Sequence, residues 1–181
     1  MPTRPRPLLA LALLVALTTI AGGFAGCGGE DEREVVEGQP VELGDLEYKV
    51  LFSRILNLND TEDHAYLEGQ PPPAPDELYL GVFFEIENTG DEEQVLPSRL
   101  TVTDTEHTEF HSLPTRSLFA LELDGELAPG EEVPELDTPA AAGPIKGSVA
   151  LFRITDSSTE NRPLELEIPG EDGPALVELD I

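Results

Sequence analysis

The stretch LYLGVFFEIE, residues 78–87, carries the strongest secondary-structure signal in this chain of 181 residues. Every second residue from position 78 to position 86 is apolar, whereas the alternate positions end in Glu85 and Glu87. A period of two is typical of a β-strand with one buried face, because successive side chains of an extended chain point to opposite sides. We therefore expect a core strand here, whose inner face is formed by Leu78, Leu80, Val82, Phe84 and Ile86.

Similar alternations occur on both sides of this strand. Apolar residues alternate from Leu46 to Phe52, and Ile55 then falls out of phase after Ser53, which predicts a β-bulge. Residues 145–154 (IKGSVALFRI) are apolar on both faces near their end, which is typical of a strand in the middle of a sheet. Shorter alternations occur at residues 100–102, 119–123, 164–168 and 177–181.

Turn-forming residues separate these segments, and no stretch carries a sustained helical stripe. Tight turns are predicted at 88–91 (NTGD), 127–130 (LAPG) and 169–174 (PGEDGP). The segment 69–75 (GQPPPAP) can continue neither a helix nor a central strand, so we expect an exposed, stiff loop there. About seven short strands with short connections predict an all-β fold, an immunoglobulin-like antiparallel β-sandwich over residues 41–181.

Three of these segments resemble a known family. The stretches VFFEIENTGDEE (82–93), LAPGEEV (127–133) and KGSVALFRI (146–154) look like the telokin-like, immunoglobulin-like domain of unknown function found in many bacterial lipoproteins. The resemblance covers roughly residues 43–181 and describes strands and turns rather than a site. It implies the same sandwich fold, and it says more about the fold than about the role.

The N-terminal segment has the layout of a secretory signal peptide. Arg4 and Arg6 precede an apolar run, residues 8–20, which loosens into alanine and glycine before position 27. The run is shorter than the roughly 20 residues that a membrane-spanning helix needs, and an acidic segment follows it. We therefore expect residues 1–26 to be removed on export.

Cys27 is the only cysteine of the chain. The motif FAGC, residues 24–27, resembles the lipobox of bacterial lipoproteins, in which the cysteine thiol becomes the thioether to diacylglycerol. The resemblance predicts lipid attachment at Cys27, and the alternative is an ordinary cysteine beside a plain cleavage site. The following residues, up to position 40, are rich in glycine and charge and have no hydrophobic period. We expect residues 27–40 to be an acidic, flexible tether.

The formal net charge of −27 excludes nucleic acid as a partner. Binding to phosphates requires clustered cationic side chains, but Lys49 and Lys146 are the only lysines. The membrane, reached through lipidated Cys27, and an extracytoplasmic protein are the partners that we expect.

No catalytic or cofactor site is predicted. The histidines of HTEFH, His107 and His111, would lie about 13 Å apart on a strand, too far to bind one zinc ion unless a tight turn falls between them. No serine lies in a GxSxG elbow, and no glycine-rich phosphate loop precedes a helix. We expect no enzymatic activity and no cofactor.

The loop NLNDTED, residues 57–63, offers the oxygen ligands that calcium requires. The candidate metal ligands are Asn57, Asn59 and Asp63, although the mid-loop glycine and closing glutamate of an EF-hand are missing. The alternative is that these acidic residues only solvate the loop. The sequence thus favours a membrane-anchored extracytoplasmic lipoprotein with an interaction or envelope-supporting domain, and the second hypothesis is a calcium-responsive sensor or binding protein that uses its acidic loops.

Overall fold

The computed structural model describes residues 33–143 and 145–181. In this part of the chain it has twelve strands, a four-residue α-helix and two 3-10 helices. The helices are η1 (Asp63–Ala65), α1 (Pro139–Ala142) and η2 (Asp156–Thr159). The strands are β1 (Arg33–Val36), β2 (Pro40–Leu43), β3 (Leu46–Leu56), β4 (Glu77–Asn88), β5 (Gln94–Val95), β6 (Thr101–Thr103), β7 (Glu109–Leu113), β8 (Glu126–Leu127), β9 (Glu132–Val133), β10 (Ser148–Thr155), β11 (Leu164–Ile168) and β12 (Ala175–Leu179).

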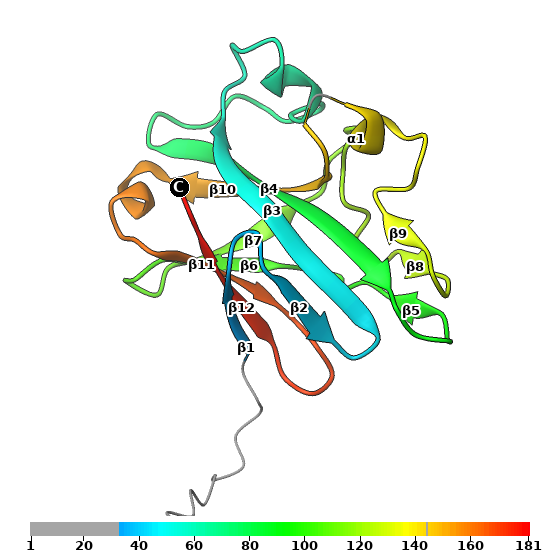
Figure 1. Ribbon diagram of the computed structural model, residues 1–181. Helices are drawn as coiled ribbons and strands as arrows, with labels where there is room; N and C mark the ends of the chain where they lie inside the picture. Colours follow the sequence, from blue (N-terminus) through cyan, green and yellow to red (C-terminus); the bar gives the residue numbers. More distant parts are fainter. Residues whose placement is uncertain (1–32, 144) are drawn as a thin grey trace, which may run out of the picture.

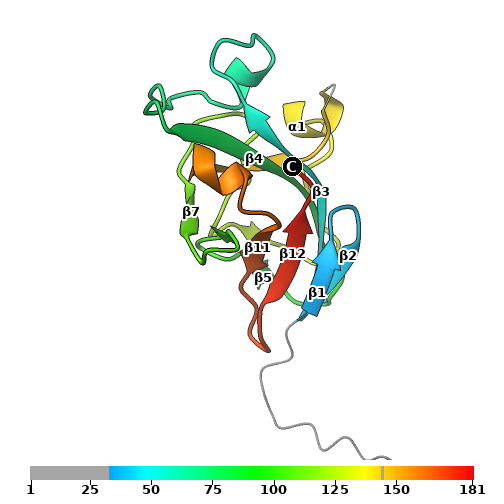
Figure 2. The ribbon, with the colours of Figure 1, turned by 90° about the vertical axis from the view of Figure 1, so that its left-hand side faces the viewer.

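The strands form a β-sandwich, as the sequence predicted (Figures 1 and 2). The first sheet has the order β1-β12-β11-β6, and the second has the order β10-β4-β3-β2, with β9 paired to β4. Strand β7 joins them, because it pairs with β6 through residues 109–111 and with β10 through residues 112–113. Strands β5 and β8 form a separate two-stranded sheet. The number of strands exceeds the expected seven because several are only two or three residues long, too short to show a period.

The core strand predicted from residues 78–87 is confirmed as part of β4. Leu80, Val82, Phe84 and Ile86 are at most 2% exposed in the main core between the sheets, and Leu78 packs partly against it. Strand β10 lies between β7 and β4, which confirms its place within a sheet. The bulge in β3 is also present, but the register shifts between Val50 and Phe52, earlier than predicted.

The predicted tether is wrong at its C-terminal end. Residues 33–36 form β1, which pairs in parallel with β12 from Arg33 opposite Ala175 to Val36 opposite Glu178. The backbone N–H groups of Arg33 and Glu37 donate to carbonyl oxygens of Pro174 and Glu178 at 3.3 and 3.2 Å. Pairing through the main chain at a sheet edge needs no hydrophobic period, and only Val35 packs partly against the core. The folded domain therefore begins at or before residue 33, and residues 27–32 lie outside the described residues.

A second apolar cluster covers half of the outer face of the second sheet. Phe83, which points away from the main core, stacks on Phe52 with ring centroids 4.4 Å apart and meets the edge of Tyr66 at 5.2 Å. The Tyr79 hydroxyl donates to the Pro71 carbonyl at 2.7 Å and so holds the proline-rich loop, which is largely exposed as predicted, onto the sheet. The cluster ends where β4 reaches Glu85 and Glu87, and the sheet face beyond this point is polar.

Candidate interaction surface

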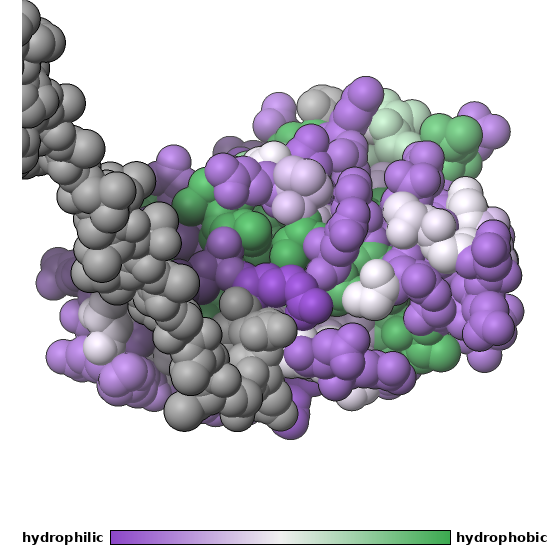
Figure 3. Space-filling view, turned by 60° about the horizontal axis from the view of Figure 1, so that its bottom comes forward, coloured by the Kyte–Doolittle hydropathy of each residue, from purple (hydrophilic) through white to green (hydrophobic). Residues whose placement is uncertain are grey.

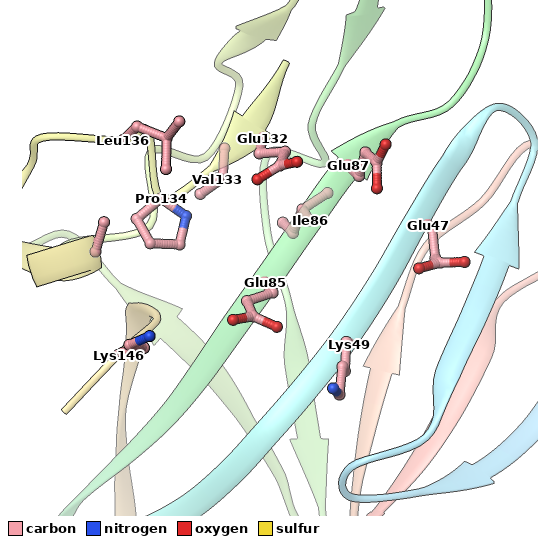
Figure 4. A pocket seen from close by; sticks show the side chains of 11 residues that line it. Glu47, Lys49, Glu85, Ile86, Glu87, Glu132, Val133, Pro134, Leu136 and Lys146 are labelled. Atoms are coloured by element: carbon pink, nitrogen blue, oxygen red, sulfur yellow. The ribbon is translucent and has the colours of Figure 1, made fainter. Parts of the chain in front are cut away.

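The polar half of the second sheet contains a groove of about 330 Å³. Strands β3, β4 and β9 line it together with Pro134, Leu136, Ala141 and Lys146 (Figure 4). The glutamates and Lys49 lie along the strands, and Pro134, Leu136 and Lys146 lie at one side. Leu136 is 80% exposed, the most exposed large apolar residue in the described part of the chain.

Four glutamates lie in register across this sheet. Glu42 of β2 is opposite Glu47 of β3, Glu47 is opposite Glu87 of β4, and Glu87 is opposite Glu132 of β9. We call these four residues the glutamate row. Directly opposed residues of antiparallel strands share one face, with Cβ atoms about 4.5–5.5 Å apart, and like charges at such positions repel each other. Figure 4 shows Glu47, Glu87 and Glu132 side by side on their three strands.

The cationic residues near the row do not neutralise the repulsion among Glu47, Glu87 and Glu132. Lys49 is opposite Glu85, two residues along the strands from the row, and Figure 4 shows Glu85 between Lys49 and Lys146. Arg33 lines a shallow hollow with Glu42 and Glu47 at the other end of the row. Within residues 33–143 and 145–181, the ion pairs closer than 4.0 Å are Arg54–Asp63 and Arg153–Glu77, so the row takes part in none.

Local hydrogen bonds fix the apolar side of the groove. Thr138 caps α1, since its hydroxyl accepts from Ala141 N at 3.4 Å and donates to the Glu135 carbonyl at 2.7 Å. Proline at the first position of α1 suits a helix start, because its fixed φ is helical and it has no N–H to satisfy. Leu136 therefore stands on a turn that is tied at both ends rather than on a free loop.

The predicted calcium ligands are engaged with other protein groups. Asp63 is only 4% exposed, and its carboxylate accepts hydrogen bonds from the Arg54 guanidinium and, at 2.8 Å, from Asn57 N. The Asn57 side-chain oxygen accepts from Asn59 N at 2.9 Å. Among the described residues, no group of three or more His, Cys, Asp or Glu side chains is arranged to hold a metal ion. Arg54 thus supplies the charge that balances Asp63, and calcium binding at this loop stays a prediction.

The two histidines of HTEFH belong to different local structures. His107 lies in the turn between β6 and β7 with φ of 63°, and His111 lies on β7 with Nδ1 3.3 Å from the Thr101 hydroxyl. The expected strand therefore holds only for the second half of the motif. The β6–β7 turn includes His107, and such a turn was the arrangement expected to bring the two rings together. Among the described residues, however, the two histidines belong to no group of three or more potential metal ligands.

Asp104 is the second buried acid among the described residues, and it is held by three hydrogen bonds. Its Oδ1 accepts from Glu106 N at 3.0 Å and Thr108 N at 2.9 Å, and its Oδ2 accepts from the Ser158 hydroxyl at 2.8 Å. Burial raises the pKa of this carboxyl, but the hydrogen bonds together, led by that from Thr108, outweigh burial and lower the pKa below its ordinary value. Asp104 therefore joins the β6–β7 turn to η2 as a structural carboxylate.

Sequence reasoning missed the glutamate row. The outward direction of Glu85 and Glu87 followed from the period of two, and the same period places Glu42 and Glu47 on an outer face. The pairing of Glu132 with Glu87 joins segments 45 positions apart, and no local pattern carries that register. Cys27, the predicted lipid attachment site, lies outside the described residues. In the part of the chain that the structure describes, no helix is long and apolar enough to cross a membrane.

Comparison with known proteins supports the fold. No protein-family model matches the chain, and no curated protein matches it. The structure is similar to that of the yjhA protein from Bacillus subtilis, with a TM-score of 0.54 and 14% identity over 81% of this chain and 99% of the other. It is also similar to a secreted protein from Mycobacterium tuberculosis, MPT63, with a TM-score of 0.52 and 10% identity over 81% and 97%. An uncharacterized β-sandwich protein from Clostridium difficile gives a TM-score of 0.50 and 13% identity over 86% and 99%.

Proposed function

We propose that this chain is an extracytoplasmic lipoprotein, anchored through acylated Cys27, whose β-sandwich is a non-catalytic binding module. The observation that carries the binding role is the uncovered, charged half of the second sheet, with a groove beside an exposed leucine. Charged side chains on an open surface attract a partner of opposite charge, and an exposed apolar side chain beside them is buried when that partner binds. The apolar cluster around Phe83 covers the other half of the same face, so the open half is a distinct surface.

The position of β1 supports an anchor close to the domain. Residues 27–32, fully extended at about 3.3–3.6 Å per residue, span about 20 Å at most. The start of β1, at Arg33, would then lie within that distance of the lipid headgroups. The β11–β12 turn lies at the same end, because Arg33 is opposite Ala175. Figure 3 views the molecule from this end and shows hydrophilic side chains over most of the visible face.

The residues that line the groove support binding rather than catalysis. They are glutamates, lysines and apolar residues, and no serine, cysteine or histidine is among the described residues that line it. Carboxylates and ammonium groups at an open surface provide ionic contacts to a charged partner. The role that fits this surface is the capture of a charged partner outside the cytoplasm.

The anchoring part of the proposal is tested by labelling producing cells with a palmitate analogue. We expect the label on the wild-type protein, which should partition into the detergent phase, and no label on Cys27→Ser. A second variant, Ser53→Ala, keeps Cys27 and should be labelled like the wild type. A wild-type protein that carries no label and partitions into the aqueous phase would contradict lipid anchoring.

A further inference from the structure

We infer that the partner of this surface is a basic, extended protein segment, which crosses the glutamate row and ends in apolar residues beside Leu136. This inference rests on the proposed binding function and names the chemistry of the partner. Its grounds are the charge of the row, the spacing of its members and the exposed leucine at one end.

The charge of the row selects a cationic occupant. Glu87 has a glutamate directly opposite it on each side, Glu47 and Glu132, and no ion pair within the described residues neutralises any of the three. A cationic side chain placed between two such carboxylates replaces their repulsion with attraction to both. A second copy of this chain, with a formal net charge of −27, would bring more negative charge to the surface and is disfavoured.

The dimensions of the row favour an extended segment. Its four glutamates lie on four neighbouring strands, so the row is about 14 Å long at about 4.8 Å per strand. Lysine or arginine residues at three alternate positions of an extended chain lie on one side and cover about 13 Å. Three cationic side chains of one short segment can therefore reach the whole row at once.

Leu136 gives the segment a direction. Glu132 forms one end of the row, and the chain then passes through Val133 and Pro134 to Leu136, which lines the same groove. An apolar residue that follows the cationic positions would bury part of this leucine, which is 80% exposed. The segment that fits the surface thus carries alternating basic residues followed by apolar ones.

The test uses the full chain in a nonionic detergent and a synthetic peptide, KSKSKLL, followed by NMR titration of backbone amides at low ionic strength. We expect saturable shifts on β3, β4 and β9, and an affinity that falls as salt is added. The double variant Glu47→Gln, Glu87→Gln should weaken binding about fivefold or more. Peptide QSQSQLL, which has no cationic side chains, should not shift these amides.

Matched variants separate this surface from the general attraction of an acidic protein. Glu109→Gln with Glu167→Gln removes the same charge from exposed positions on β7 and β11, and should change the affinity by less than about twofold. Leu136→Ser should weaken KSKSKLL several-fold and leave the analogue KSKSKSS unchanged. Equal losses in the two double variants, or no loss in the Glu47, Glu87 variant, would overturn the inference.

The lipid anchor is tested separately. Cys27→Ser should bind KSKSKLL as the wild type does, because residue 27 precedes the folded domain. A wild-type protein that binds KSKSKLL but carries no palmitate label would contradict the anchor and support the surface. Normal labelling without peptide binding would contradict the surface alone.

Discussion

The glutamate row predicts that removing one of its charges stabilises the protein. Glu87 has two like charges directly opposite it, Glu47 and Glu132. At about 5 Å in water, each pair repels by about 0.8 kcal/mol, and screening at physiological ionic strength lowers this to about 0.4 kcal/mol. Neutralising the central member in Glu87→Gln should therefore raise the free energy of unfolding by about 0.5–1 kcal/mol.

The matched control is Glu85→Gln, two positions earlier on the same strand. Glu85 is opposite Lys49, so its neutralisation removes an attraction and should lower the free energy of unfolding by a few tenths of a kcal/mol. Each variant removes one negative charge, so any general effect of the acidic surface on stability is the same in both. Urea unfolding, with a denaturant that does not screen charge, measures both values. The reasoning is refuted if the two changes have the same sign, or if the gain in Glu87→Gln persists in 1 M salt.

Three further changes test other parts of the account. Val35→Pro removes an N–H from the parallel pairing of β1 with β12 and should lower the free energy of unfolding, measured in urea, by more than about 1 kcal/mol. An unchanged free energy of unfolding would mean that the flexible tether extends to residue 40, as the sequence predicted. The folded-state pKa of Asp104 lies below its ordinary value of 3.8, so its contribution to stability is present above pH 3.8 and is lost as the pH falls through the folded-state pKa. The variant Asp104→Asn should therefore be less stable than the wild type at neutral pH and should lose less stability on acidification. Thermal unfolding measured against pH tests both expectations. Asp63→Ala leaves Arg54 without its carboxylate partner and should destabilise the fold by about 1–3 kcal/mol, equally in sodium and in calcium. A saturable rise in the melting temperature of the wild type with calcium, absent from Asp63→Ala, would support the calcium hypothesis instead.

The sequence predicted those parts of the fold that a local period encodes. The inner face of β4 and the presence of a bulge in β3 followed from alternation along one strand. The place of β10 within a sheet followed from apolar residues on both of its faces. Strand β1 escaped prediction because its edge pairing uses main-chain groups and buries little more than part of Val35. The ring cluster at Phe83 was missed because its partners, Tyr66 and Phe119, come from distant loops.

The candidate surface depends on register, which the sequence does not display. Glu87 could be placed on the outer face from the pattern of β4 alone, but its neighbours Glu47 and Glu132 come from two other segments. The calcium hypothesis shows the same limit, because Arg54, which binds Asp63, lies on β3, nine positions earlier. Alternation thus identifies a face, and strand pairing decides which charges meet on it.

The most direct test of the central claim compares carboxylate labelling in membranes of the producing cells with labelling of the purified chain in detergent. A carbodiimide and an amine modify accessible glutamates, and mass spectrometry measures the modified fraction at each position. We predict that Glu47 and Glu87 are protected in the membranes and accessible in the purified chain, whereas Glu109 and Glu167 are modified equally in both. Equal modification of Glu47 and Glu87 in the two samples would contradict the claim that this surface binds a partner in the cell envelope.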